Sequence, residues 1–512
     1  MRTLPGGAVD DGTAPGTRAA QEGILRRQAA REPAARTYAR ALPIVPVRAR
    51  GMTIEGADGR RYLDCLSGAG ALALGHNHPV VLEAIRKVLD SGAPLNVLDL
   101  ATPVKDAFIT ELFHTLPPGL ADRARVRFCG PAGGDAVETA GELVRAATGR
   151  TGLIAFTGAC HGRAAGPPAA STVAHDVRIT RLPYPQDYRC PFGVGGEAGA
   201  DLAARWTESV LGDPTSGVPL PAGMIVEPVQ GEGGVIPAPD VWLRRMRQLT
   251  ADRSVPLIAD EIQTGVGRTG AFWAVQHSGV TPDVMVLSKA IGGSLPLAVV
   301  VHRDDLDTGE SGAPTGTFRG NQLAMAAGTA TLAHVREHSL AERAAALGAR
   351  MLSQLRSLAG EFTCVGEVRG RGLMIGVEFV DPDGEARENG EVAGVGRIPR
   401  EAVRGDSGAD GTGGRCRDRA VEASAVPAAP VIPDRARRPL PAAPELAAVV
   451  QRECLRRGLI VGLGGRHTSV VRLLPPLTIT DEQATAVLDR LADAVRAAAR
   501  RQADAAAAPY TP

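Results

Sequence analysis

The sequence predicts an α/β protein with a buried, largely parallel β-sheet at its centre. Two observations lead to this prediction. Six short apolar runs recur between residues 126 and 301, and helical segments such as Asp135–Thr148 and Val241–Asp252 lie between most of them. Apolar runs that alternate with helices are typical of βα units, in which helices cover both faces of the sheet. The runs are Val126–Cys129, Leu153–Phe156, Met224–Val226, Pro256–Ala259, Val284–Leu287 and Leu297–Val301.

The residues before this layer predict a tail, a helix and a hairpin. Residues 1–18 are rich in Gly, Pro, Asp and Thr, which favours disorder. A helix is expected at Arg18–Arg31, followed by a hairpin at Met52–Leu63 that turns at Asp58-Gly59. After the last apolar run, residues 321–358 predict two consecutive helices that lead out of the sheet layer.

The C-terminal part predicts a second structured unit interrupted by an insertion. Residues 381–444 contain no aromatic residue and much Gly, Pro, Ala, Arg and Asp, so we expect a disordered insertion there. The tail after Arg500 is Ala-rich and expected to fray. The expected elements are a strand-like Gly366–Phe379, a helix Glu445–Arg457, a Gly-rich turn from Gly462, a strand Val470–Leu474 and a helix from about Asp481.

Composition excludes several classes of function. The 57 basic and 56 acidic residues nearly cancel, and aromatic residues make up only 3%, so neither a nucleic acid nor an anionic membrane is an expected partner. No apolar stretch approaches the length of a membrane span, and the N-terminus has no signal-peptide pattern. The seven Cys are scattered, with no C-x-x-C, which indicates reduced thiols and a cytoplasmic protein.

Three motifs resemble nucleotide or metal sites, but each lacks a feature that such a site requires. Residues 256–261 resemble a Walker-B strand, but no Lys follows a Gly as a P-loop requires. Gly265–Gly270 matches G-x-G-x-x-G, yet no long helix follows it, so NAD binding is not expected. His76 and His78 could bind a metal, but they lie in a loop with no further ligand nearby, which favours a structural turn.

A stronger set of residues joins three strand ends. The strand at 126–129 runs into a glycine turn, and the helix that follows offers its free N–H groups to a phosphate. Asp260 ends one apolar strand, and Lys289 follows another. Only three of the 57 basic residues are Lys, so a Lys at the edge of a buried sheet is not expected to be an ordinary surface cation. A phosphate site, a buried acid and a Schiff-base lysine are the parts that pyridoxal phosphate (PLP) needs.

These stretches resemble the class III (ornithine/ω-amino acid type) aminotransferases of PLP fold type I, over residues 38–380 and 445–498. The resemblance implies a large, mainly parallel α/β/α domain at 76–335. It also implies a smaller α+β domain from 19–75, 336–380 and 445–500, with 1–18, 381–444 and 501–512 outside the compact structure. The matching stretches are Gly75–Pro79, His161-Gly162, Glu227–Glu232, Asp260–Gly270, Leu287–Gly293, Gly316–Asn321 and Arg472–Pro476.

The resemblance also implies a role for each site residue. Lys289 would bind the cofactor covalently and act as acid and base, and Asp260 would pair with the ring nitrogen. Glu232 would mask Arg472 while an ω-amine donor reacts and release it for the carboxylate of glutamate or 2-oxoglutarate. Thr317 would reach the phosphate of a partner subunit, which implies a homodimer or higher homo-oligomer. The remaining cofactor-binding residues would be Gly133, Gly134, Cys160, His161, Glu227 and Gln263.

Within the family, four stretches resemble the diaminobutyrate–2-oxoglutarate group. This implies amino transfer from glutamate to aspartate 4-semialdehyde, giving 2,4-diaminobutyrate. Ornithine or 4-aminobutyrate transamination is the first alternative, and a catalytically impaired homologue with a binding role is the second. The four stretches are Ser67–Ala71, Phe128–Pro131 with Asp135–Glu138, Gly316–Gln322 and Val471–Leu477.

The sequence departs from the family pattern at Cys160, at Gly134 and at residues 163–168, which lack the usual run of small hydroxyl and apolar residues. Cys160 stands where the family has Tyr or Phe against the cofactor ring, so we expect weaker cofactor binding. Gly134 replaces a hydroxyl residue and removes one hydrogen bond to the phosphate. Gly141 weakens the helix at the phosphate site by about 1 kcal/mol relative to Ala.

Overall fold

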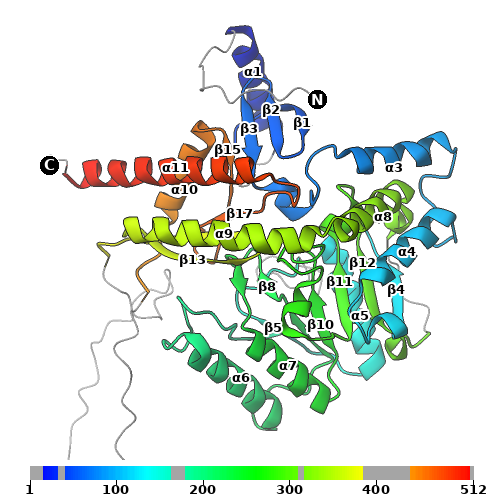
Figure 1. Ribbon diagram of the computed structural model, residues 1–512. Helices are drawn as coiled ribbons and strands as arrows, with labels where there is room; N and C mark the ends of the chain where they lie inside the picture. The colour runs from blue at the N-terminus through cyan, green and yellow to red at the C-terminus, as the bar shows by residue number, and fades with distance from the viewer. Residues whose placement is uncertain (1–14, 33–40, 163–178, 310–315, 385–438, 508–512) are drawn as a thin grey trace, which may run out of the picture.

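The computed structural model describes residues 15–32, 41–162, 179–309, 316–384 and 439–507. Its centre is a seven-stranded sheet (Figure 1), and the predicted α/β class is confirmed. In spatial order the strands are β4 (Ala124–Phe128), β12 (Val299–Arg303), β11 (Val284–Leu287), β10 (Leu257–Asp260), β7 (Gly223–Val226), β5 (Leu153–Phe156) and β6 (Ile179–Leu182).

Six of the seven strands run parallel to one another. Only β12 is reversed, and it pairs antiparallel with both β11 and β4. The six apolar runs therefore correspond to strands, with boundaries shifted by up to two residues. The sequence analysis missed β6, the edge strand with the sequence Ile-Thr-Arg-Leu, because three of its four residues are only partly buried and two are polar.

Helices cover both faces of this sheet. Along β10, successive side chains enter different core clusters, since Leu257 joins one cluster and Ile258 another. The cluster that contains Ile258 packs against α5 (Gly133–Thr148). The cluster that contains Leu257 packs against the opposite layer, formed by α6 (Gly196–Gly212) and α7 (Asp240–Asp252). The buried sheet is thus a rigid support for the residues at its ends.

A second layer combines the two ends of the chain. One four-stranded sheet contains β1 (Pro46–Arg50), β2 (Thr53–Gly56), β3 (Arg61–Asp64) and β15 (Leu459–Ile460). The short strand β15 pairs parallel with β3 across almost 400 residues of sequence. The other sheet contains β13 (Val365–Arg371), β14 (Met374–Phe379), β17 (Val470–Leu473) and β16 (Gly462–Gly464).

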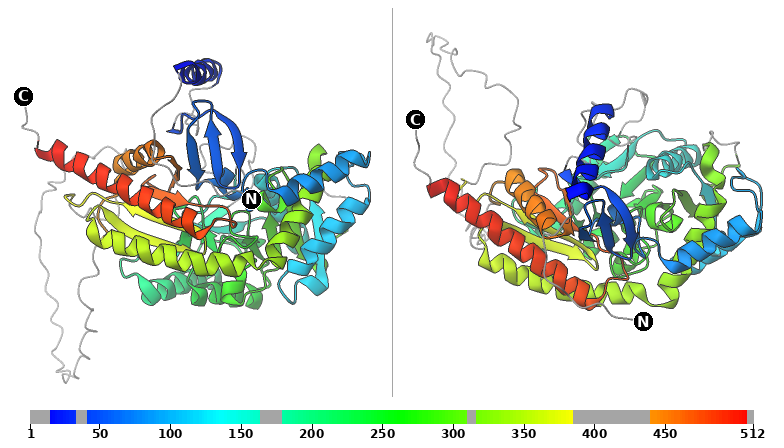
Figure 2. Two further views of the ribbon diagram at one scale, coloured as in Figure 1. Left: turned by 45° about the horizontal axis from the view of Figure 1, so that its top comes forward. Right: turned by 90° about the horizontal axis from the view of Figure 1, so that it is seen from above.

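The remaining helices connect and cover these layers. Figure 2 shows α11 lying beside α9 in both views, and α10 packs against α11. None of the helices in the described ranges is long and apolar enough to cross a membrane. The helices are α1 (Pro15–Arg31), α3 (Pro79–Asp90), α4 (Pro103–Thr115), α8 (Gln322–Glu337), α9 (Leu340–Glu361), α10 (Pro444–Arg456) and α11 (Asp481–Ala507). The short strands β8 (Val229–Gln230) and β9 (Ile236–Pro237) form a separate pair.

Four sequence-based expectations differ from the structure. Helix α1 begins at Pro15, inside the segment expected to be disordered, and α11 continues to Ala507, beyond the expected fraying point. Residues 366–379 form two strands rather than one, because Gly372 has a positive φ of 54° that turns the chain between them. Residues 462–464 form strand β16 instead of a turn. Residues 1–14, and 385–438 of the expected insertion, lie outside the described part of the chain.

Candidate active site

The predicted site residues gather at one edge of the central sheet. Because β4, β5, β7, β10 and β11 all point the same way, their carboxyl ends lie at this edge. Ligands of α/β proteins bind at this edge of a parallel sheet. The residues at or just after the five strand ends are Gly133 and Gly134 (β4), Cys160 and His161 (β5), Glu227 (β7), Asp260 (β10) and Lys289 (β11).

Asp260 and His161 form a buried pair. Nδ1 of His161 lies 2.8 Å from Oδ2 of Asp260, and Oδ1 of Asp260 accepts a hydrogen bond from the backbone N–H of Ile262. Burial alone would lower the pKa of His161, but the bond to Asp260 and its negative charge raise it above its ordinary value. The Asp260 carboxyl thus accepts one hydrogen bond from the backbone and lies against a buried imidazole, at the carboxyl end of β10. A carboxylate in this position can hold a protonated ring nitrogen.

Glu227 joins two loops of the site. Its Oε1 accepts the backbone N–H of Cys160 and its Oε2 accepts that of Gly231, each at 2.9 Å. Burial raises the pKa of Glu227 to about 7, with His161 acting to lower it and Asp260 to raise it. The carboxylate is therefore committed to backbone donors on both sides, and the loops that carry Cys160 and Glu232 are fixed relative to each other.

Lys289 lies in a conformation that is rare for a residue with a side chain. Its φ is 52°, in the left-handed region, directly after β11. The side chain is partly buried, and this burial lowers the pKa of its amine despite the opposing charges of Glu232 and Asp260. A lowered pKa raises the fraction of neutral amine, the form that attacks an aldehyde. Strain of this kind persists where the surrounding structure fixes the backbone.

Gln263 is held from the second layer. Its Nε2 donates to the carbonyl of Ala69 at 2.9 Å, and its Oε1 is buried without a hydrogen-bond partner. Gly231 packs so closely that a Cβ there would lie 1.7 Å from Oε1. Sequence analysis missed Ala69 as a contact because a backbone carbonyl 194 residues away leaves no signal in the pattern.

Arg472 and Glu232 form the next pair. Nη1 of Arg472 donates to Oε1 of Glu232 at 2.6 Å, whereas Nε and Nη2 of Arg472 are buried with no partner. Arg472 is 1% exposed, but the Glu232 side chain is 42% exposed. A Cβ on Gly464 would lie 2.7 Å from Nε of Arg472, which explains why glycine occupies strand β16 at this position. Two unsatisfied guanidinium donors suit a carboxylate ligand.

The glycine turn opens helix α5 as predicted, but Thr317 is not joined to it. Helix α5 begins at Gly133, and a Cβ on Gly162 would lie 2.9 Å from Cα of Gly134, so the two loops are in close contact. Among the described residues, no hydrogen bond links Thr317 to this turn within one chain. Thr317 is exposed, and its carbonyl accepts a hydrogen bond from Asn96.

The motifs that were set aside have structural roles. His76 binds Asp64 at 2.8 Å, and the ring of His78 lies 4.8 Å from that of His334 at an angle of 56°, so the two histidines have different partners. Gly270 packs against Ala345 of α9. A Cβ on Gly270 would lie 2.9 Å from the Cβ of Ala345. Within the described ranges, no group of three or more His, Cys, Asp or Glu could hold a metal ion.

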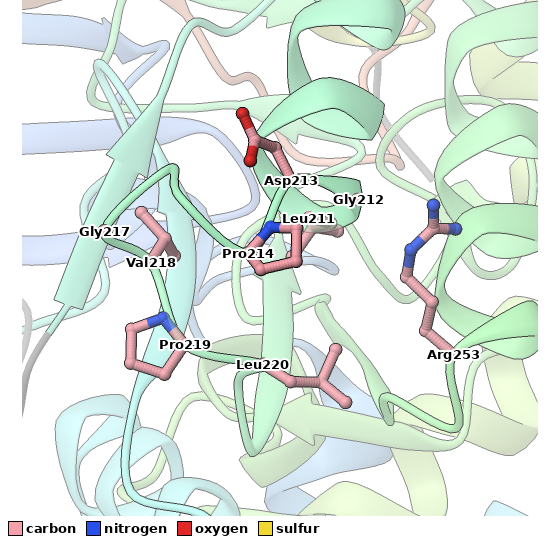
Figure 3. Close-up of a pocket in the computed structure, with 9 residues that line it drawn as sticks. All are labelled: Leu211, Gly212, Asp213, Pro214, Gly217, Val218, Pro219, Leu220 and Arg253. Carbon is pink, nitrogen blue, oxygen red and sulfur yellow. The ribbon is translucent and has the colours of Figure 1, made fainter.

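A surface pocket lies away from these residues. Figure 3 shows it in the connection between α6 and β7. Its volume is about 610 Å³. Its residues precede β7 and β10, so it lies towards the amino ends of these strands, whereas the predicted site lies at their carboxyl ends. It is lined by Leu211, Gly212, Asp213, Pro214, Gly217, Val218, Pro219, Leu220 and Arg253.

The chain is similar to known proteins over most of its length. A family described as aminotransferase class-III matches residues 34–402. A diaminobutyrate–2-oxoglutarate aminotransferase of Rhizobium meliloti is 47% identical over 94% of this chain and 93% of its own length. A protein of the same name from Haemophilus influenzae is 39% identical over 93% of this chain and 96% of its own length.

The chain is also similar to solved structures of transaminases over most of its length. An (S)-enantioselective omega-transaminase from Thermomicrobium roseum superposes with a TM-score of 0.73 and 25% identity, covering 93% of this chain and 98% of that one. An amine transaminase from an uncultivated Pseudomonas species, in its PLP-bound form, superposes with a TM-score of 0.72 and 27% identity. It covers 92% of this chain and 97% of that one.

Proposed function

The chain belongs to the class III aminotransferases, and from this premise we propose that it transfers an amino group between glutamate and aspartate 4-semialdehyde, giving 2-oxoglutarate and 2,4-diaminobutyrate. The predicted family and the predicted aminotransferase activity are confirmed by the family match and by the two relatives of 47% and 39% identity. Both relatives are diaminobutyrate–2-oxoglutarate aminotransferases, which supports the proposed substrates.

Pyridoxal phosphate is the cofactor, and the residues present fit it. Buried polar atoms without partners, Nε2 of His161 and Oε1 of Gln263, belong to the same strand-edge region as Lys289 with its lowered pKa. Helix α5 opens at Gly133 with free backbone donors, which suit a phosphate. When bound, the cofactor supplies an electron sink for the amino-bearing carbon of the substrate.

The chain's own residues would then act as follows. Lys289 would supply the amine that attaches the cofactor and would take and return the proton at the reacting carbon. Asp260, supported by His161, would hold the ring nitrogen protonated, and Gln263 would contact the phenolic oxygen. Gly133 and Gly134 would bind the phosphate through their N–H groups. Cys160 would lie against the ring face, and Glu227 would hold its loop through the bond to the Cys160 N–H.

The carboxylate that pairs with Arg472 would determine which substrate the site accepts. Among the described residues the side-chain hydrogen-bond partner of Arg472 is Glu232 alone, and two of the buried Arg472 donors are unsatisfied. A carboxylate of glutamate or 2-oxoglutarate would satisfy those donors with a strong charge-assisted pair. When the ω-amine end of diaminobutyrate reacts, no carboxylate reaches this point, and Glu232 keeps the buried cation paired.

We also propose a homodimer and a cytoplasmic location. Thr317 is exposed beside Phe318, whose exposed fraction is 64%, and exposed leucines lie in the adjoining loop at Leu95, Leu98 and Leu100. An apolar surface next to an unused phosphate-binding residue fits a second copy of the chain, in whose site Thr317 would act. The six cysteines in the described ranges are free thiols, which supports a reducing compartment.

A spectral titration tests the proposed function. The holoenzyme should absorb in the visible, and this band should bleach on addition of glutamate or 2,4-diaminobutyrate and return with the matching oxo acid. Lys289→Ala should show neither the band nor turnover. Ornithine and 4-aminobutyrate serve as competing donors, and faster turnover with either would reject diaminobutyrate as the substrate. If no donor bleaches the band, an impaired homologue with a binding role is the better description.

A further inference from the structure

Glu232 lies in a glycine-rich turn that joins strands β8 and β9, and within it the N–H groups of Gly234 and Val235 both donate to the carbonyl of Gly231. The turn, residues 231–235, contains glycine at positions 231, 233 and 234, and Gly234 and Val235 both have positive φ. Glycine is the residue with the greatest backbone freedom, so contacts from outside the turn add to these two bonds in fixing its shape. Because the Glu232 side chain is 42% exposed, its ion pair with Arg472 depends on where the turn places it.

Three contacts hold the turn from three directions. At its start, the N–H of Gly231 donates to Glu227. In its middle, the carbonyl of Glu232 accepts the N–H of Gly465 at 2.9 Å. At its end, the carbonyl of Gly234 accepts a hydrogen bond from Nε of Arg369 at 2.9 Å. Arg369 belongs to strand β13, so the third contact comes from that strand.

Arg369 is itself fixed by a buried charge network. Its Nη1 donates to Glu378 of β14 at 2.6 Å and to Glu367 of β13. Glu378 is 3% exposed and also pairs with Arg189. Strand β14 is hydrogen-bonded to β17, the strand of Arg472, with Gly376 opposite Arg472. The guanidinium of Arg369 thus ties the turn of Glu232 to the sheet that carries Arg472.

We propose that Arg369 is a positioning residue that strengthens the Glu232–Arg472 ion pair by holding the Gly234 end of the turn. This inference rests on the proposed function, in which Arg472 alternates between Glu232 and a substrate carboxylate. A held turn lowers the conformational entropy that the pair loses when it forms. Arg369 therefore favours the paired state, which suits the diamino substrate, over the open state, which suits a dicarboxylate.

The substitution Arg369→Lys isolates this contact. Lysine keeps a positive charge for Glu378 and Glu367 but has no Nε donor for Gly234. Glutarate serves as an inert dicarboxylate whose dissociation constant in the holoenzyme is measured by calorimetry. We expect R369K to bind glutarate about threefold more tightly and to raise the KM for diaminobutyrate about threefold, since ordering one side chain has an effect of this size. General structural damage would weaken both.

A double-mutant cycle shows whether Arg369 acts through Glu232. Glu232→Gln should also bind glutarate more tightly, and adding R369K to it should change the dissociation constant no further. Arg371→Lys, in the same strand but paired with Asp240, is the matched control and should leave both constants unchanged. If R369K gives no folded holoenzyme, Glu378→Gln loosens the same guanidinium and should shift glutarate binding in the same direction.

The outcomes separate this inference from the proposed function. It is overturned if R369K shifts both constants in the same direction, shifts neither, or has an equal effect in the E232Q background. It is also overturned if the unaltered holoenzyme does not bind glutarate. Opposite shifts that vanish in the E232Q background support it. Failure of the unaltered enzyme to react with diaminobutyrate, while glutarate binding responds as expected, rejects only the proposed substrate.

Discussion

His161 and Asp260 lie 99 residues apart in the sequence, yet Nδ1 of the first lies 2.8 Å from Oδ2 of the second. Each follows or ends a strand of the central sheet, and β7 separates their strands β5 and β10. Both side chains are buried, so their interaction is little screened by solvent. The geometry makes the imidazole a source of positive charge behind the carboxylate.

Replacing His161 should therefore reduce catalysis more than substrate binding. A hydrogen bond to a charged group contributes about 1.5–3 kcal/mol, so we expect His161→Gln to lower kcat roughly tenfold to a hundredfold with little change in KM. Steady-state kinetics at saturating cofactor measure both constants. A KM that rises in proportion to the loss of kcat would show instead that the residue shapes the substrate pocket.

Glu227 should make stability depend on pH in a defined direction. Its folded-state pKa, about 7, is above the ordinary value of 4.5 because the group is buried, so the folded protein binds this proton more tightly than the unfolded chain. The resulting contribution to the free energy of unfolding is present below pH 4.5 and is lost as the pH rises to 7. Glu227→Gln does not titrate and should flatten this slope. Denaturant unfolding of the cofactor-free protein between pH 5 and 8 measures it.

Cys160 offers a direct test of cofactor affinity. The thiol is exposed, and its backbone N–H is held by Glu227, so the loop would keep its position with another side chain. An aromatic ring against the cofactor is worth about 0.5–1.5 kcal/mol, so Cys160→Tyr should bind PLP about threefold to tenfold more tightly. Equilibrium dialysis gives the dissociation constant. Cys160→Ser, which adds no ring, should be unchanged, and an equal gain for Ser would contradict the stacking argument.

Two glycines of helix α5 should respond in opposite ways to Ala. A Cβ on Gly141 would lie 3.2 Å from Nη2 of Arg145, the far end of a flexible side chain, so Gly141→Ala should stabilise the protein by up to about 1 kcal/mol. A Cβ on Gly133 would lie 2.9 Å from Cδ1 of Ile262, which is partly buried and packs against the core. Gly133→Ala should therefore destabilise it. Equilibrium unfolding compares the two, and equal signs would contradict this reading of the packing.

Much of the large domain could be predicted because its strands are buried on both faces. Continuous apolar runs such as 284–287 have no other simple interpretation, and a Lys just after such a run must lie at the sheet edge. Strand β16 was misread because Gly464 makes room for Arg472 and Gly462 makes room for Leu66, and these tertiary contacts have no local pattern. The hydrogen bond between Gln263 and Ala69 is likewise a tertiary contact that has no local pattern in the sequence. Residues predicted from strand ends were found together, but their partners across layers required the structure.

The flanks of the insertion predict that residues 385–438 can be removed. Val380 forms an antiparallel bridge with Ala442, and the N–H of Asp381 donates to the carbonyl of Pro441 at 2.9 Å. Arg189 also binds the carbonyl of Leu440. The residues on either side of the segment are therefore already held next to each other. A Gly/Ser linker of about four residues could join them.

We expect this replacement to leave the unfolding midpoint and the rate of transamination within about twofold of the unaltered enzyme, because the loop-closure entropy depends only weakly on length. The matched control removes residues 381–384 and 439–442 as well. It therefore also removes the bridge between Val380 and Ala442, which lies close to Glu378 in the sequence. That control should lower stability, because β14 loses its continuation and Arg189 loses one of its partners. A large loss of activity in the shorter deletion, with stability retained, would assign residues 385–438 a direct part in the reaction.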